Sequence, residues 1–185
     1  MKLIELENIA ANCKLCELYK GQIKPVFAKG NEEADIIICG MCPGPGENKI
    51  GIPFVGPAGK ILDEVIFRAF TLKSKVYITN LIKCYVKPGI ILQPEWMNIC
   101  LPYFIVQLSI IKPKIIITLG KDISNFLLNK NDSMGSMRGN IYDYMGIKLL
   151  STYHPAFLAR GGGIQHKHFD TVVKDFKTAL KYIGG

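Results

Sequence analysis

The sequence lacks several features that mark specialised classes of protein. No uninterrupted apolar run reaches the length that a membrane-spanning helix needs. The first five residues, Met-Lys-Leu-Ile-Glu, are mixed and acidic, unlike the start of a signal peptide. No internal repeat, linker or low-complexity tract is visible. We therefore expect one domain over residues 1–185, no membrane association, and a cytoplasmic location, or a nuclear one where the source or a viral host has a nucleus.

Acidic residues are scarce relative to basic ones. The chain has 15 Asp and Glu against 23 Lys and Arg, which gives a formal net charge of +8 and a sequence pI of about 9.2. Such an excess suits a surface that binds a polyanion, with nucleic acid as the first candidate. A basic protein without such a partner is the alternative, because a sequence does not show how charge is distributed over the surface. Apolar residues make up 49% of the chain, which favours a folded core over disorder.

The six cysteines do not indicate a disulfide framework, since the chain carries no secretion signal. They occur as Cys13-x2-Cys16, Cys39-x2-Cys42, Cys84 and Cys100. Ligation of a metal ion or cluster is the more specific interpretation of this spacing. A redox dithiol or a chance pair remains the alternative for a lone C-x2-C.

Apolar periodicity predicts strands that alternate with helices. We expect buried strands at residues 34–38, 76–80, 114–119 and 147–152, and residues 141–144 as a hairpin partner or short strand. We expect helices at residues 1–12, 60–70, 94–111, 121–129 and 165–183, with Pro102 kinking or interrupting the third of these. Residues 17–30 and 130–140 are expected to be irregular. This alternation predicts a three-layer α/β/α sandwich with a central, mostly parallel, four-stranded sheet.

Three groups of chemically suggestive residues follow predicted strands. They are the glycine- and proline-rich segment Gly40–Phe54, Asn80, and His154-Pro155. The carboxyl ends of parallel strands share one edge, so we expect these groups to line a single pocket. Considered alone, Asn80 is more typical of a cap or turn, Phe54 of a core residue, and a histidine before proline of a structural residue.

Four sequence blocks, in this order, give the chain a resemblance to a known family. They are Cys13-x2-Cys16, GIPFVGPAG at residues 51–59, TNLIKC at 79–84 and YHPAFLAR at 153–160. The chain resembles the family 4 uracil-DNA glycosylases, the iron–sulfur branch of the uracil-DNA glycosylase superfamily. The resemblance implies a DNA repair hydrolase that cleaves the N-glycosidic bond of uracil and leaves an abasic site, with uracil-containing DNA, single- or double-stranded, as its substrate.

The resemblance assigns roles to the residues at the strand ends. Phe54 is expected to stack on the flipped base, and Asn80 to pair with its N3–H and O4 edge. His154 is expected to donate to O2 as negative charge develops there, with help from backbone groups of Gly40, Met41 and Cys42. Glu47 matches the carboxylate expected to orient water and stabilise the cationic sugar; an exposed loop glutamate is the alternative.

The resemblance also implies a cofactor and a DNA-contacting segment. A [4Fe–4S] cluster is expected on Cys13, Cys16, Cys84 and Cys100, which makes the N-terminal part an iron–sulfur-binding segment; a zinc ion is the minority alternative. The segment after His154 matches the family's minor-groove loop, in which Phe157 or Leu158 is expected to fill the space left by the flipped base and Arg160 to contact phosphate.

The chain departs from the family in the loop after the first strand. The family's Gly-Glu-Ala-Pro-Gly appears here as Gly40-Met41-Cys42-Pro43-Gly44, and its later Glu-Asp pair as Glu47-Asn48. These differences keep two alternatives open: a DNA-binding relative without catalysis, and a glycosylase for another deaminated base such as hypoxanthine or xanthine. We expect a monomer, with a replication or repair protein as a further candidate partner.

Overall fold

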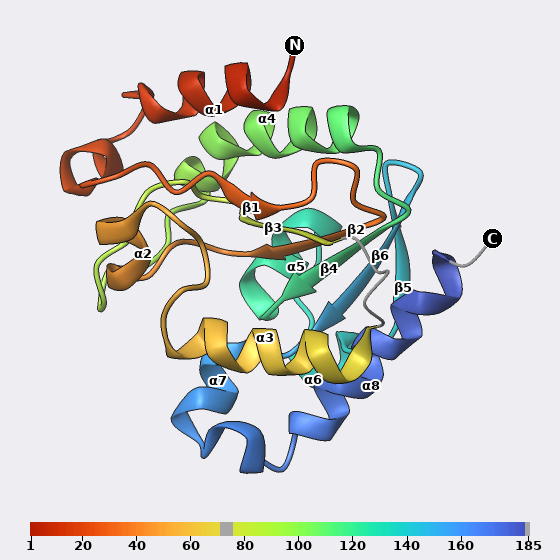
Figure 1. Ribbon diagram of the computed structural model, residues 1–185. Helices are drawn as coiled ribbons and strands as arrows, with labels where there is room; N and C mark the ends of the chain where they lie inside the picture. Colours follow the sequence, from red (N-terminus) through yellow and green to blue (C-terminus); the bar gives the residue numbers. More distant parts are fainter. Residues whose placement is uncertain (71–75, 184–185) are drawn as a thin grey trace.

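The chain folds into a six-stranded sheet with helices on both faces (Figure 1). The structure is a computed structural model and describes residues 1–70 and 76–183. The strands are β1 (Ala28–Gly30), β2 (Ile36–Gly40), β3 (Val76–Asn80), β4 (Ile115–Leu119), β5 (Ile141–Tyr144) and β6 (Ile147–Thr152). The α-helices are α1 (Leu3–Ala11), α2 (Pro45–Ile50), α3 (Pro57–Ala69), α4 (Pro94–Ile111), α5 (Lys121–Leu128), α6 (Met134–Met137), α7 (Pro155–Arg160) and α8 (Phe169–Ala179). Short 3₁₀ turns occur at Glu17–Gly21, Gly163–Gln165 and Leu180–Tyr182.

The strand order, β1-β3-β2-β4-β6-β5, places four parallel strands at the centre of the sheet. Strand β2 runs through α3 to β3 on one side, and the chain then crosses through α4 to β4 on the other side of β2. This reversal is a topological switch point, where open parallel sheets leave a crevice beyond the carboxyl ends of their strands.

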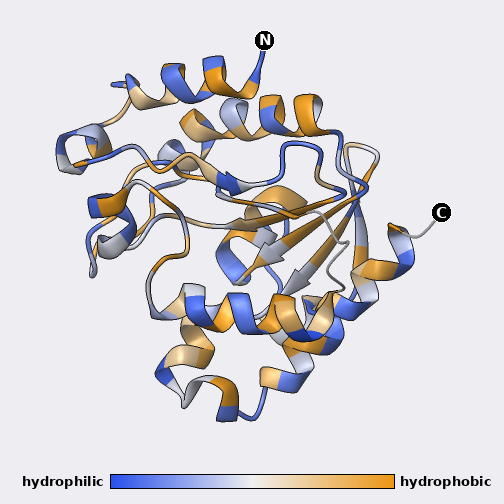
Figure 2. Cartoon of the chain, in the orientation of Figure 1, coloured by the Kyte–Doolittle hydropathy of each residue, from blue (hydrophilic) through white to orange (hydrophobic). Residues whose placement is uncertain are grey.

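Alternate residues of the central strands pack against the two helical layers. Ile37 and Ile116 face the core shared with α1, α4 and α5, whereas Ile36 and Ile115 face the core shared with α3, α7 and α8. Parallel strands covered on both faces are apolar throughout, and the central strands are mostly orange in the hydropathy colouring of Figure 2. The predicted three-layer α/β/α architecture is confirmed.

The predicted strand count was too low by two. The four predicted strands form the parallel centre, and β1 and β5 add antiparallel edges to it. The sequence raised β5 as an alternative but missed β1, because three residues, Ala28–Gly30, are too few to show an alternating pattern.

Three segments expected to be loops contain short helices, and one expected helix is not interrupted. Helix α2 lies within the first loop, whose proline and glycine content did not indicate a helix. Pro45 takes the first helical position, and Gly51 ends the helix with a φ of 87°. Similarly, residues 155–160 form α7 rather than a loop. Residues 130–140, expected to be loop, contain the four-residue α6. Helix α4 continues from Pro94 to Ile111 without an interruption at Pro102.

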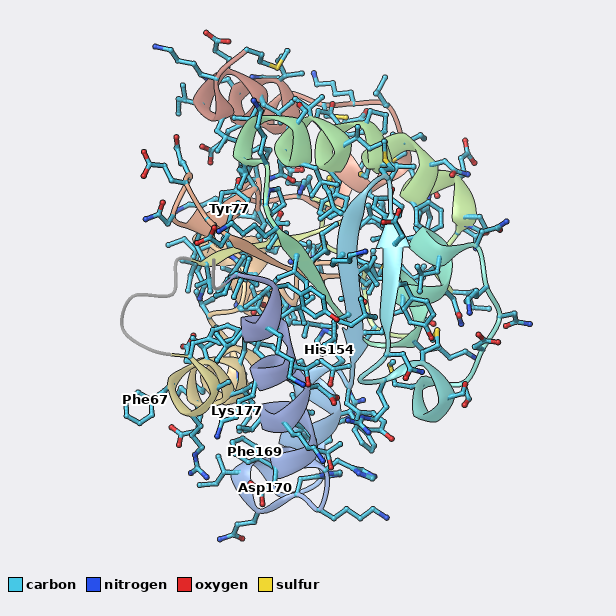
Figure 3. All side chains as sticks on the ribbon, turned by 90° about the vertical axis from the view of Figure 1, so that its right-hand side faces the viewer. Phe67, Tyr77, His154, Phe169, Asp170 and Lys177 are labelled. Carbon is cyan, nitrogen blue, oxygen red and sulfur yellow. The ribbon has the colours of Figure 1, made fainter. Side chains whose placement is uncertain are left out.

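Two phenylalanines on neighbouring helices differ in their surroundings. Phe67, on the outer face of α3, points away from the molecule, whereas Phe169 lies between α3 and α8 (Figure 3). Across the described part of the chain, no helix combines the length and hydropathy needed to cross a bilayer.

Candidate active site

A cavity of about 600 Å³ lies at the carboxyl edge of the parallel strands, where the switch point predicts one. Its volume falls in the range of small-molecule pockets. The walls come from the segment after β2, the end of β3 with its following loop, and the start of α7. The principal lining residues are Met41, Cys42, Gly44, Glu47, Phe54, Asn80, Tyr85, Val86, His154, Ala156 and Arg160. The expected meeting of the three strand-end groups is therefore observed.

Asn80 presents an uncommitted acceptor to this cavity. The residue ends β3 and is only 2% exposed. Its Oδ1 is the one buried side-chain nitrogen or oxygen without a hydrogen-bond partner in residues 1–70 and 76–183. A buried polar atom without a partner is costly and uncommon, so its presence at a cavity wall indicates a ligand-binding position.

Gly40 makes room for that amide. It pairs with Asn80 across the parallel β2–β3 ladder. A Cβ at position 40 would lie 2.4 Å from Asn80 Oδ1 and 2.7 Å from Cζ of Phe54. Only glycine therefore allows the amide and the aromatic ring to stand where they do.

Phe54 is held in an unusual backbone conformation, with a φ of 52°. The Nζ of Lys29 donates a hydrogen bond to its carbonyl oxygen at 3.0 Å. A Cβ at Gly59 would lie 2.0 Å from the same oxygen, so the start of α3 packs directly against this peptide. Positive φ in a phenylalanine is strained and is kept only where the surroundings fix it, which is common at binding sites. The ring is thereby fixed 6.0 Å, centroid to centroid, from the imidazole of His154.

His154 caps the N-terminus of α7, and its Nδ1 accepts a hydrogen bond from the backbone N–H of Ala156 at 3.0 Å. Because Nδ1 is an acceptor, the proton of the neutral ring is on Nε2. Burial lowers the pKa of His154 to about 4, with a further decrease from Arg160 and an opposing effect of Glu47. His154 is therefore a neutral hydrogen-bond donor at physiological pH.

Glu47 lies in the first turn of α2 and is 8% exposed. Its Oε1 accepts hydrogen bonds from the backbone N–H groups of Val55 and Gly56, both at 3.2 Å. Gly56 precedes α3, so the carboxylate lies at that helix's N-terminus, where negative charge is favoured. The other oxygen faces Gly44, where a Cβ would lie 2.5 Å from it. Contrary to the exposed-loop alternative, Glu47 is buried at the cavity wall.

Met41 and Cys42, which replace Glu and Ala of the family pattern, both line the cavity. Burial raises the pKa of the Cys42 thiol to about 11, with smaller contributions from Asp122 and Glu47. Cys42 is therefore a neutral thiol and not an activated nucleophile. Cys39, by contrast, is fully buried in the core.

Tyr85 and Val86 were missed by the sequence reasoning. Both line the cavity from the loop that follows β3. Their position immediately after Cys84 at a strand end was an available signal, but the loop has no apolar periodicity that would single out two of its residues.

The four cysteines expected to hold a cluster line a second, narrow cavity together with Lys83 and Tyr103. The thiols come from three segments: the turn after α1, the loop after β3, and α4. Burial and the neighbouring thiols Cys100, Cys16 and Cys13 raise the pKa of Cys84 to about 12. Among the described residues, no group of three or more Cys, His, Asp or Glu is arranged to hold a single metal ion. The all-sulfur donor set nevertheless fits an iron–sulfur cluster, in which each thiolate binds a different iron and the sulfurs stand farther apart than around one ion.

Comparison with known proteins identifies the family. Residues 27–177 match the model of the uracil DNA glycosylase superfamily. A type-4 uracil-DNA glycosylase of Saccharolobus solfataricus is 40% identical over 155 residues, which cover 78% of this chain and 71% of that protein. The type-4 enzymes of Pyrobaculum aerophilum and Thermotoga maritima are 33% and 32% identical, over 86% and 92% of this chain and 86% and 89% of theirs.

The chain belongs to the type-4 uracil-DNA glycosylases. The family resemblance of the sequence is thereby confirmed. As a type-4 glycosylase, the chain keeps the pocket blocks within the matched superfamily region, whereas Cys13 and Cys16 precede residue 27.

In this type-4 glycosylase the expected DNA-contacting residues differ in accessibility. Phe157 is 40% exposed on α7, and Arg160 lines the cavity mouth from the same helix. Leu158 is 0% exposed and packs in the core beside α3 and α8. The expectation that Leu158 serves as a wedge is therefore corrected, because helix formation by residues 155–160 turns this side chain inward.

Proposed function

We propose that this chain hydrolyses the N-glycosidic bond of uracil in DNA, leaving an abasic site, with the cavity at the carboxyl edge of the sheet as its active site. The observation that carries the assignment is the unpartnered Oδ1 of Asn80, buried in a wall that also holds Phe54 and His154. The type-4 family membership supports the same reaction.

The amide of Asn80 selects the base. Its Oδ1 accepts from N3–H of uracil and its Nδ2 donates to O4, a pattern that cytosine reverses. The phenyl ring of Phe54 offers a face for the flipped base. A site whose buried polar groups would be mispaired by the wrong base discriminates by about 10⁴-fold or more.

Bond cleavage leaves negative charge on O2 of the departing uracil and positive character on the sugar. The Nε2–H of neutral His154 donates to O2, and its strength as a stabiliser grows as the charge develops. Because Nδ1 is already fixed by the N–H of Ala156, the donor needs no reorganisation during the reaction. Backbone groups of Gly40, Met41 and Cys42 form the adjoining part of the pocket.

Glu47 supplies negative charge on the sugar side. One oxygen is bound by the N–H groups of Val55 and Gly56, which leaves the other to orient the attacking water and to stabilise the cationic sugar. The same carboxylate fixes the peptide segment that carries Phe54, so it also shapes the pocket.

The cofactor of the proposed enzyme is a [4Fe–4S] cluster held by Cys13, Cys16, Cys84 and Cys100, the four thiols that share one cavity. The cluster supplies cross-linking rather than a reaction step, because it ties the N-terminal segment to the loop after β3 and to α4. This arrangement makes the chain one domain with an iron–sulfur-binding N-terminal segment.

Phe157 and Arg160 are the proposed DNA contacts, the first filling the space left by the flipped nucleotide and the second binding phosphate. The net charge of +8 favours the same partner. Four further points stay predictions: single- or double-stranded DNA as the substrate, a monomeric state, a repair or replication partner, and a cytoplasmic or nuclear site of action.

An oligonucleotide assay tests the function. Protein purified without oxygen is incubated with single- and double-stranded DNA carrying one uracil, and abasic sites are cleaved with alkali. We expect cleavage, and we expect Asn80→Ala and His154→Ala each to slow it by about 10²-fold or more. A DNA-binding protein that releases no base would overturn the assignment, and preferential release of hypoxanthine or xanthine in competition would replace uracil as the substrate.

A further inference from the structure

Lys83 is a buried cation beside the proposed pocket that the mechanism does not use. It is 4% exposed. Its Nζ donates to Oγ1 of Thr79 at 2.8 Å, to the backbone oxygen of Asn80 at 2.6 Å and to Oε1 of Gln107 at 2.8 Å. An ammonium group has three protons, so its donors are fully used. The shortest of the three bonds holds the peptide of the residue proposed to recognise uracil.

The other end of Lys83 contacts the cysteine cavity. Lys83 lines that cavity, and Cys84, one of the proposed cluster ligands, is the next residue in the chain. Gln107, which binds the ammonium group, lies on α4 two turns after Cys100. A single residue therefore lines the cavity of the proposed cluster ligands and bonds to the residue proposed to read the base.

The network continues beyond Lys83 and leaves its members little freedom. The Nε2 of Gln107 donates to the hydroxyl of Tyr77, which orients the amide so that its oxygen faces Lys83 (Tyr77 is labelled in Figure 3). The hydroxyl of Thr79 donates to the carbonyl of Phe27 and so accepts from the ammonium group. Burying an ammonium group is unfavourable unless such bonds compensate, and an apolar side chain would fill the same space at lower cost.

We propose that Lys83 is a positioning residue that couples the four-cysteine centre to the uracil pocket, by holding the main chain of Asn80 and thereby the direction of its amide. The inference rests on the proposed function. Loss of the ammonium group frees the Asn80 peptide, so the amide samples orientations that no longer match uracil. A charged hydrogen bond of this kind is worth about 10- to 100-fold in affinity.

Lys83→Met tests the coupling because it keeps the length and the apolar stem while removing the charge. Binding is measured by fluorescence anisotropy with two oligonucleotides, one carrying 2′-fluoro-2′-deoxyuridine and one 2′-fluoro-2′-deoxycytidine, whose glycosidic bonds resist cleavage. Lys114→Met is the matched control, since that ammonium group pairs with Asp35 at 3.3 Å at the opposite end of β4. Iron content and melting temperature are recorded for each protein.

We expect Lys83→Met to lower the uracil-to-cytosine affinity ratio by about 10- to 100-fold with iron content retained, and Lys114→Met to leave the ratio unchanged. A purely structural role would lower the active fraction without changing the ratio, and that result would overturn the coupling. A wild-type protein without preference for uracil would instead overturn the proposed function. If Lys83→Met does not fold, Gln107→Leu replaces it as the test. This variant removes one of the three acceptors of the Lys83 ammonium group, so the uracil-to-cytosine affinity ratio should fall several-fold. An unchanged ratio would count against the proposal.

Reciprocity provides a second readout that does not depend on activity. If the pocket and the cysteine centre are coupled through Lys83, binding of the 2′-fluoro-2′-deoxyuridine oligonucleotide should protect the iron of the wild-type protein. The chelator concentration that removes half of the iron should then rise. The Lys83→Met protein should lose this protection while it still binds DNA at high concentration. Equal protection in both proteins would exclude the coupling.

Discussion

The proposed uracil pocket and the four-cysteine cavity lie at either end of residues 80–84, and they fix their functional groups by different means. In the pocket, His154 is oriented by the N–H of Ala156, and Glu47 by two N–H groups at the start of α3. In the cysteine cavity, burial and mutual repulsion raise the pKa of Cys84 and Cys100. The proposed uracil base, which is neutral, is met by dipoles already fixed in the fold. The four cysteines, two of them buried, would need a cationic centre to hold them together as thiolates.

The largest expected effect of a pocket substitution is on the rate of base release. His154→Ala removes the Nε2–H donor, and we expect the single-turnover rate to fall by about 10²–10³-fold with iron content unchanged. Alkali cleavage of abasic sites at saturating enzyme gives the rate. A fall of less than tenfold would contradict the role of His154 at O2.

Gly40→Ala tests whether the fixed position of the Asn80 amide matters for binding. The added Cβ would lie 2.4 Å from Asn80 Oδ1, so the amide must shift. We expect at least tenfold weaker binding of the 2′-fluoro-2′-deoxyuridine oligonucleotide. This loss of affinity is about that caused by losing one hydrogen bond to a well-placed partner. Gly21→Ala is a control outside the cavity, because a Cβ there meets nothing within 4 Å. Equal losses in the two variants would show that the amide position is not decisive.

Cys13→Ser addresses the cysteine side of the comparison. This thiol lies in the N-terminal segment and contacts the cavity of the cluster rather than the pocket. We expect loss of the cluster and a melting temperature lower by about 5–15 °C, as for the loss of a cross-link that closes a long loop. The single-turnover rate of uracil release at saturating enzyme and low temperature should change only a few-fold, because the coupling through Lys83 acts on affinity for the base. A loss of rate as large as that of His154→Ala would show that the centre takes part in the reaction itself.

The smallest expected effect is that of pH on the pocket. The pKa of His154 is lowered to about 4, against about 6.5 for a histidine in an unfolded chain. Base release should therefore be constant from about pH 8 to pH 5 and decline towards pH 4, as the imidazole becomes charged. Between pH 6.5 and pH 4, His154 is protonated in the unfolded chain but not in the folded one. The free energy of unfolding is therefore highest above pH 6.5, and the contribution of His154 is lost as the pH falls towards 4. An inflection of the rate near pH 6.5 would contradict the buried, neutral imidazole.

The central sheet and its pocket edge were predictable because their signals are strong. The apolar run Ile36–Ile38 and the polar residues at strand ends fix both the parallel layer and the meeting of Asn80 with His154. Short elements were not predictable. Strand β1 has three residues, α2 begins at a proline within a glycine-rich segment, and α7 begins at a proline and has only six residues. Because α7 was not foreseen, Leu158 was placed on the wrong face.

The contacts that hold the site residues in place were also beyond the sequence. Nothing in the pattern around Lys29 or Lys83 distinguishes them from surface lysines, although one binds the carbonyl of Phe54 and the other that of Asn80. Such contacts depend on which segments the fold brings together, and only the three-dimensional structure shows them.

The most direct test of the central claim is the release of N3-methyluracil from DNA compared with that of uracil. The methyl group removes the N3–H that the unpartnered Oδ1 of Asn80 is proposed to accept. We predict that the wild-type protein releases uracil at least 10²-fold faster than N3-methyluracil, and that Asn80→Ala makes the two rates similar. Similar rates for the two bases in the wild-type protein would contradict recognition by Asn80 and with it the account of this pocket.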